Sequence, residues 1–443
     1  CFVFRLGFAL KRFESGPCAM SRYGAVETVD RTLCSNDADN ELRRSFFFMS
    51  ICFAVNHGLA SVPLAVASSL LDQTTCFIGF AVFYALATVS TLILSVPLAS
   101  FLGPHHGLVV AMLCFTAYIG GFVGAIYTSN SWLGLPVWVI ASAFGGLGGG
   151  LMWTSQGVYF SAVASALAAT TGKTLEATTG NLAGSFSFVF LIFEVFAKLS
   201  FFGLQEAMIS TSAIGIMYAV VAALPIVAML VAEPAPCLVA AKSPVSLYAV
   251  AAGQISGTVS LWRDLALWLL SPTNLTFGFC AALMNGFVSG ELVAPELGVA
   301  HVAVLSTLTV VVAAACSVAF GWASDRHLGK GVILVTGAGA FLCISGCILL
   351  LGCCGGWGWW SSVLYVCQGI GRAVYESTNR AAFADHFPGE QKSGAFANCA
   401  LQSNLAFAIS FALQGRLSVD ALATVVVVLA LSTPVLYSLI PTR

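Results

Sequence analysis

Long apolar runs separated by short polar turns dominate the chain from about residue 46 to its end. Two neighbouring runs, Val302–Phe320 and Val332–Leu351, contain no Lys, Arg, Asp or Glu. Each is about long enough to cross a bilayer as a helix, which takes roughly 20 residues. The pattern predicts twelve spanning helices, near residues 46–69, 75–101, 107–127, 133–155, 181–203, 209–232, 266–290, 299–320, 331–352, 359–379, 393–413 and 419–440.

Composition agrees with this pattern. Of the 443 residues, 58% are hydrophobic and 8% are charged, whereas a soluble domain has about 25% charged residues. We therefore expect a multi-pass protein surrounded by the lipid bilayer, with no nucleic acid partner. The fifteen cysteines form no CxxC pair, and most lie inside apolar runs. We expect them to be packing residues, and we expect neither a metal nor a cofactor.

The distribution of basic residues predicts the orientation. With the N-terminus inside, all but two of the 18 Lys and Arg residues fall in segments on the inner side. The two exceptions are Lys198 and Arg416. Because basic residues resist translocation, twelve spans with both termini in the cytoplasm fit best. The sequence does not show which cellular membrane holds the protein.

The two halves of the chain resemble each other. Residues 99–109 align without gaps on residues 323–333, and residues 157–161 match residues 373–377 in shape. Each match has the same place within its half, although chance similarity between apolar segments is an alternative. We predict an N-terminal tail (1–45), a six-helix bundle (46–232), a central loop (233–265) and a second bundle (266–440). Within the loop, Val245–Val259 is mildly amphipathic and could lie along the membrane surface.

The charged turn after the eighth predicted span carries a motif. The stretch Gly321–Lys330 resembles the glycine–x–x–x–aspartate–arginine–x–x–glycine–basic signature in the cytoplasmic loops of the major facilitator superfamily. The resemblance implies a latch between helices, while an ordinary charged turn is the simpler alternative. Its first-half counterpart at 103–107 lacks both charges. The predicted latch residues are Gly321, Asp325, Arg326, Gly329 and Lys330.

A narrower resemblance appears in three segments. Residues 148–159, 285–298 and 371–398 are similar to spans four, seven, and ten to eleven of the uncoordinated (Unc-93-like) family of major-facilitator-like proteins. Together with the topology, the resemblance implies an all-α membrane protein of two six-helix pseudo-repeats around a central polar cavity. Members of the family include ion channel regulators, proteins tied to potassium balance, and escorts of innate immune receptors.

Charges inside the spans are informative because an ionisable group at the centre of a bilayer costs about 2.5–3.5 kcal/mol or more. Glu194 and Lys198 lie one turn apart on one face; they form a cavity-facing ion pair, or Lys198 extends outward instead. Residues 368, 372, 376 and 380 form a polar stripe that is either a permeation surface or a structural seam. The cavity candidates, from charge and resemblance, are Asn56, Gln156, Tyr159, Glu194, Lys198, Asn285, Glu291, Gln368, Arg372, Tyr375, Glu376 and Asn379.

Smaller signals favour structural roles. His57 is more easily explained as a satisfied buried histidine, and Asn398 and Gln402 as partners in bonds across helices. Asn274 begins an Asn-Leu-Thr glycosylation sequence, but the predicted topology places it on the cytoplasmic side, where it stays unmodified.

Two functions remain open. The first is a regulator of an ion channel, of ion (potassium) homeostasis, or of the traffic of a receptor, acting through lateral helix contacts. The second is a secondary transporter of a small solute or ion, coupled to protons or cations through Glu194 or Glu376. No phosphate-binding loop, dinucleotide fingerprint or nucleophile elbow is present, so we do not expect an enzyme.

Overall fold

The computed structural model describes residues 36–239, 247–326, 329–352, 356–389 and 391–440. The described part is built from helices. In the first half these are α1 (Asn36–Val66), α2 (Gln73–Val89), α3 (Ser95–Tyr127), α4 (Gly134–Thr171), α5 (Leu175–Glu206) and α6 (Thr211–Val231). The linker contains α7 (Pro236–Val239) and α8 (Leu247–Ser260). The second half contains α9 (Leu265–Leu283), α10 (Ala294–Leu297), α11 (Val299–Arg326), α12 (Lys330–Leu351), α13 (Ser362–Val374), α14 (Arg380–His386), α15 (Gln391–Leu413) and α16 (Val419–Ser438).

These helices make twelve spans. Ten helices in the described residues are long and apolar enough to cross a membrane. One of the ten, Gln73–Tyr127, contains two spans, because Gly103 has φ +77° and Pro104 follows it. Only glycine adopts such a backbone easily, so the chain turns back at this point. The twelfth span is the broken helix of α13 and α14 together with the π-helical turn between them.

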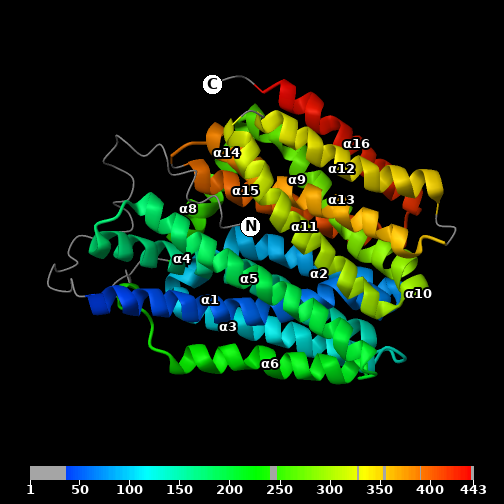
Figure 1. Cartoon of the computed structure of the whole chain (residues 1–443), viewed down its shortest axis with the longest axis horizontal. Coiled ribbons are helices and arrows are strands. Elements are labelled where there is room, and N and C mark those ends of the chain that lie inside the picture. Colours follow the sequence, from blue (N-terminus) through cyan, green and yellow to red (C-terminus); the bar gives the residue numbers. More distant parts are fainter. Residues whose placement is uncertain (1–35, 240–246, 327–328, 353–355, 390, 441–443) are drawn as a thin grey trace.

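The spans form two bundles, as predicted. Figure 1 shows α1–α6 on one side and α9–α16 on the other, with the spans running roughly parallel. Two pairs of helices hold the bundles together: α2 packs on α15, and α5 packs on α11. We call the end of the molecule that carries Gly103 and Gly329 the motif end, and the end that carries Gln73 and Gly298 the opposite end.

Several helices are longer than the sequence pattern predicted. α1 begins at Asn36 instead of residue 46, and α4 continues to Thr171 instead of residue 155. The turn after α4 is short because Gly172 takes φ +65°, and Thr174 then caps α5 by accepting a hydrogen bond from the backbone N–H of Ala177. The extension of α1 is polar, with Asp39, Glu41, Arg43 and Arg44, so hydropathy does not show where this helix begins. The extension of α4 is mostly small and apolar, and the helix is simply longer than one bilayer crossing requires.

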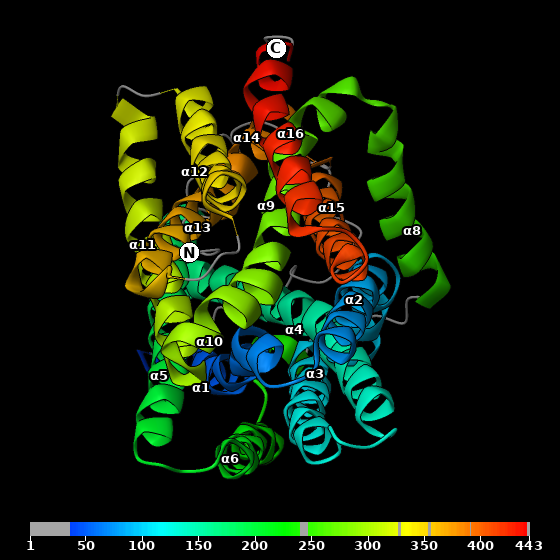
Figure 2. The same ribbon diagram turned by 90° about the vertical axis from the view of Figure 1, so that its right-hand side faces the viewer.

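The linker helix α8 contacts both bundles. The spans run along the horizontal axis of Figure 1. Figure 2 views the molecule along the spans and shows that α8 lies across their direction. Gln254 donates a hydrogen bond to the backbone oxygen of Thr91, at 2.8 Å. Asn398 of α15 donates to the backbone oxygen of Thr258, at 2.9 Å. A helix is present over the described part of the segment expected at Val245–Val259, from Leu247 onward, and it is anchored to both bundles.

In the part of the chain that the structure describes, three spans contain π-helical turns, which the sequence pattern did not predict. They are η3 (Ser90–Leu94), η5 (Met284–Val293) and η7 (Tyr375–Asn379). Such turns shift the register of side chains along a helix and occur often at functional positions. In the tenth span, η7 changes the direction in which the polar side chains after Val374 point. The polar stripe predicted at residues 368, 372, 376 and 380 is therefore interrupted within the helix.

Candidate functional site at the junction of the two bundles

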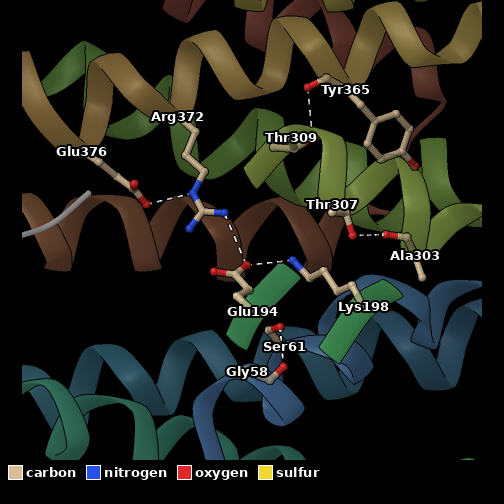
Figure 3. A network of polar contacts seen from close by, with 10 residues as sticks. All are labelled: Gly58, Ser61, Glu194, Lys198, Ala303, Thr307, Thr309, Tyr365, Arg372 and Glu376. Atoms are coloured by element: carbon tan, nitrogen blue, oxygen red, sulfur yellow. Dashed lines mark hydrogen bonds and ion pairs between the residues drawn. The ribbon is translucent and has the colours of Figure 1, made fainter. Parts of the chain in front are cut away.

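Four charged side chains meet where α5 of the first bundle faces α13 and η7 of the second (Figure 3). Within α5, Lys198 donates a hydrogen bond to Glu194 Oε1 at 2.8 Å, and the two residues are 4% and 3% exposed. Lys198 therefore does not extend outward to the membrane surface, which was one of the two alternatives. The pair is satisfied inside the protein, as the cost of an isolated charge in lipid requires.

Arg372 connects this pair to the second bundle. Its Nε donates a hydrogen bond to Glu376 Oε1 at 2.9 Å, and its Nη1 lies 3.7 Å from Glu194 Oε1. Figure 3 shows the Arg372 guanidinium between the two carboxylates. The link within each bundle is thus shorter than the link between the bundles. Each bundle contributes one positive and one negative group to the cluster, and each pair is neutral on its own.

A ring cluster surrounds His57 in the first bundle. The His57 ring lies 5.0 Å from Phe190, 5.5 Å from Trp153 and 5.7 Å from Phe115, measured between centroids, and it stacks on Phe53 at 5.6 Å. These rings come from α1, α3, α4 and α5. Edge-to-face contacts of this kind are the favourable geometry for aromatic pairs. The cluster supports a packing role for His57, but the expectation of a satisfied histidine is wrong, because its buried Nδ1 has no hydrogen-bond partner among the described residues.

A chain of amides lies beside the charged cluster in the second bundle. Asn379 of η7 donates to Asn274 of α9 at 2.7 Å, and Asn274 donates to Gln402 of α15 at 2.6 Å. Tyr375 shares a hydrogen bond with Ser403 at 2.8 Å. The predicted cross-helix role of Gln402 is confirmed. Asn274 is fully buried inside α9, which is the physical reason that its glycosylation sequence is inaccessible.

Asn398, the second predicted bridging residue, also bonds across helices. Its Nδ2 donates to Thr258 of α8, and its Oδ1 accepts from Trp262 Nε1 at 2.8 Å. Asn398 thus fastens the linker to α15.

The structure corrects the cavity role expected for Asn56. Its Nδ2 donates to the backbone oxygens of Met112 and Ala222, at 3.2 and 2.9 Å, and to Thr116 Oγ1 at 3.1 Å. Asn56 is therefore fully buried between α1, α3 and α6, and faces away from the second bundle. Asn56 and His57 are adjacent, so they point to different sides of α1, and sequence alone did not show which side faces the centre.

Other predicted candidates lie outside the charged cluster. Gln156 and Tyr159 are buried in α4 instead of lying at its end, and the Tyr159 hydroxyl shares a 2.7 Å hydrogen bond with Ser45 of α1. Gln368 is 5% exposed in α13, one turn before Arg372. Gln368 Oε1 is buried and has no hydrogen-bond partner among the described residues.

Asn285 and Glu291 belong to a contact at the opposite end. The backbone oxygen of Asn285 accepts a hydrogen bond from Ser68 at 2.6 Å, and Glu291 accepts one from Gln73 at 2.7 Å. A Cβ on Gly290 would lie 2.6 Å from the backbone oxygen of Ser68, so only glycine permits this approach. The segment between α1 and α2 is therefore closed onto η5.

The latch motif is described in part. Gly321 lies in α11, Gly329 precedes α12, and Lys330 forms an ion pair with Asp385 of α14. The side chains of Asp325 and Arg326, which end α11, lie outside the described part of the structure. In the first-half counterpart, His105 Nε2 lies 2.8 Å from the backbone oxygen of Met229.

The arrangement can hold charge. Among the described residues, no group of three or more His, Cys, Asp or Glu side chains lies close enough to bind a metal ion. The feature that sequence reasoning missed is the link between Glu194 and Arg372. The sequence indicated each of these residues separately. Their pairing could have been suspected, because each is a charged residue inside an apolar span and needs a partner of opposite charge.

A family model described as ion channel regulatory protein UNC-93 matches residues 68–344. The chain belongs to the UNC-93 family. A model of the major facilitator superfamily matches residues 270–442, so the wider family expected from the Gly321–Lys330 motif is also found. Protein unc-93 homolog A of Bos taurus is 26% identical over 417 residues, which cover 84% of this chain and 86% of the relative.

Solved structures share the fold of this UNC-93 family member. A peptide transporter in complex with sulfate has a TM-score of 0.65 at 14% identity, covering 90% of this chain and 94% of that one. The D-xylose-proton symporter has a TM-score of 0.56 at 13% identity, with 91% and 97% covered. The nucleoside transporter NupG has a TM-score of 0.56 at 11% identity, with 89% and 99% covered. At these identities the likeness shows the major-facilitator fold alone.

Proposed function

We propose that the protein regulates an ion channel in the membrane, through lateral contacts between its spans and those of a channel subunit. The observation that carries this proposal is the match of residues 68–344 to the family of ion channel regulatory proteins. The same kind of lateral contact with a membrane partner would also serve the control of potassium balance or of the traffic of a receptor.

The charged cluster supports a regulator. A carrier coupled to protons needs a carboxylate that gains and loses a proton during each cycle. Here Glu194 is held by Lys198 and Arg372, and Glu376 is held by Arg372. Both carboxylates are thus engaged in ion pairs within the protein, as expected for a structural contact.

We also propose that both termini face the cytoplasm, with the motif end on the same side. The distribution of Lys and Arg supports this orientation. With this orientation fixed, a channel partner in the same membrane would meet the spans in only one direction along the membrane normal.

The test is co-expression of the full chain with a panel of potassium channels, measuring whole-cell current and the amount of channel at the cell surface. A change in either quantity for a channel that also co-purifies with the protein is the expected result. In parallel, purified protein in proteoliposomes is assayed for uptake of potassium, sodium and small organic ions. Saturable uptake without an effect on any channel would overturn the proposal.

A second candidate function is secondary transport, and one observation favours it. The contact between Arg372 and Glu194 joins the two bundles near mid-span and, at 3.7 Å, is the long link of the cluster. It could break when the bundles rock, as in transporters built from two repeats. If so, uptake would disappear in Glu194→Gln and in Glu376→Gln, while Thr336→Ala, on the exposed face of α12, would keep it.

A further inference from the structure

A cavity of about 540 Å³ lies between α2 and α15, in the part of the two helices nearest the opposite end. Its volume falls within the range of roughly 300–1,000 Å³ that is usual for small-molecule sites. Figure 2 shows α2 beside α15. Because α2 belongs to the first bundle and α15 to the second, the cavity that they line is on the seam between the bundles. We call it the seam groove.

The walls of the seam groove are apolar and face outward. Ile78 and Ile409 line it and are 37% and 46% exposed. Small residues keep it open, namely Ala81, Ala85, Ala408 and Ala412. On a protein whose spans are surrounded by lipid, a groove open at the sides of two spanning helices meets acyl chains.

Aromatic rings form the inner side of the groove. Phe77 and Phe411 line it, with ring centroids 6.4 Å apart. Phe411 also packs on Phe80 at 4.9 Å, and Tyr84 stacks on Phe407 at 4.1 Å. These contacts fill the space between α2 and α15, so the groove is a surface channel with a packed floor.

One basic residue stands at the mouth of the groove. Arg416 is exposed and lies in the turn between α15 and α16, where the spans end. The turn is held in place: Gly415 has φ +80°, the Arg416 N–H donates to the backbone oxygen of Leu413 at 3.0 Å, and Gln414 donates to Ala282 of α9 at 3.0 Å. Arg416 is thus one of two basic residues that the orientation analysis left on the outer side, and Lys198, the other, is paired inside the protein.

No carboxylate forms an ion pair with Arg416 in the described part of the chain, including Asp420 in the first turn of α16. Asp72 accepts a hydrogen bond from the backbone N–H of Thr75 at 2.9 Å, and Glu291 accepts one from Gln73. An arginine above an apolar groove at the end of two spans matches a phosphodiester above acyl chains, because the guanidinium binds phosphate with paired hydrogen bonds.

We propose that the seam groove binds a phospholipid, with one acyl chain between α2 and α15 and the phosphate on Arg416. A lipid seated there contacts both bundles and favours the arrangement in which the opposite end is closed. This proposal stands whether the protein regulates a channel or transports a solute, because it concerns a different surface.

The test is native mass spectrometry of the purified, delipidated full chain with added lipid. Phosphatidylcholine is compared with a diacylglycerol of the same acyl chains, which lacks the phosphate. We expect phosphatidylcholine to bind more tightly than the diacylglycerol. Arg416→Gln should weaken phosphatidylcholine binding by about tenfold, because the charged hydrogen bonds to the phosphate are lost. Diacylglycerol binding should not change. Arg416→Lys should retain part of the preference.

A second variant tests the groove itself. Ala81→Phe should reduce the binding of both lipids. Val428→Phe should leave the binding of both lipids unchanged, because Val428 is 60% exposed on α16, outside the groove. Arg263→Gln at the motif end is the matched charge control. Three outcomes would each overturn the proposal. They are equal binding of the two lipids by the unmodified protein, an unchanged lipid preference in Arg416→Gln, and a spanning helix of another protein found in the groove in place of lipid.

Discussion

At the scale of single residues, the cluster of Glu194, Lys198, Arg372 and Glu376 governs how charge is tolerated inside the bundle. Lys198 and Glu194 are almost fully buried, so neither can be rehydrated when its partner is lost. Removing one member of a buried pair leaves an uncompensated charge, which is strongly destabilising, whereas removing both is often neutral. The pair is therefore expected to behave as a unit.

We predict that Lys198→Met lowers the free energy of unfolding by about 3–5 kcal/mol, because Glu194 then loses its 2.8 Å partner. The double variant Glu194→Gln with Lys198→Met should recover most of that loss. Thermal unfolding of the purified protein in detergent measures both. If the double variant is as unstable as the two single changes added together, the pair does not act as a unit.

Sequence reasoning identified all four charges of the cluster, and it gave the bond between Glu194 and Lys198 as one of two alternatives. It did not identify the contact of Glu194 with Arg372, because the two residues are far apart in the chain and no periodicity relates them. It misplaced Asn56 for a similar reason: which face of the first span points to the centre depends on how α3 and α6 pack against it.

At the scale of helices, close packing in the second bundle depends on small residues where α9 meets α15. A Cβ at Gly278 would lie 2.2 Å from the backbone oxygen of Ser403. Small residues at such contacts let helix backbones approach within a membrane. The same approach lets Asn274 reach Gln402.

We predict that Gly278→Leu destabilises the protein by roughly 1–3 kcal/mol, because a larger side chain forces α9 and α15 apart. The matched control is Gly339→Leu on α12, where an added Cβ would meet no atom within 4 Å. Thermal unfolding in detergent compares the two. Equal behaviour of both variants would contradict the packing argument.

Helix number and order were predictable from hydropathy, but helix ends and π-helical turns were not. α4 runs on to Thr171 with small and apolar residues, several of them buried against other helices. The residues of η7 are polar, but a polar composition does not by itself indicate a π-helical turn. Both features follow from contacts with other helices. A sequence pattern read one segment at a time does not contain them.

At the scale of the whole molecule, the two bundles are closed onto each other at the opposite end. Ser68 and Ser69 bond to η5 through the backbone oxygens of Asn285 and Ser289, and Gln73 bonds to Glu291. Regulation by lateral contact does not require this end to open, while transport does.

We predict that Gln73→Cys combined with Glu291→Cys can be joined by a short reagent that links two thiols. The wild-type side chains lie 2.7 Å apart. Cleavage at a protease site inserted in the central linker, followed by denaturing electrophoresis, shows whether the two halves remain joined. Either cysteine alone serves as the control, and separation of the halves in the double variant would contradict the closed arrangement. A joined protein should still affect its channel, but it could not transport.

We also predict that tags on the N- and C-termini react from the same side of the membrane, because an even number of spans returns the chain to the side on which it began. Impermeant labelling of intact cells, compared with permeabilised cells, measures this. Tags found on opposite sides would contradict twelve spans.

The neutrality of each of the two ion pairs has a consequence for biogenesis. Glu194 meets Lys198 one turn later in the same helix, and Arg372 meets Glu376 in the same way. A nascent chain leaving the ribosome can therefore pass its fifth span through the translocon with the acid already matched, long before the tenth span has been synthesised. Only the final docking of the two bundles has to wait for the complete polypeptide.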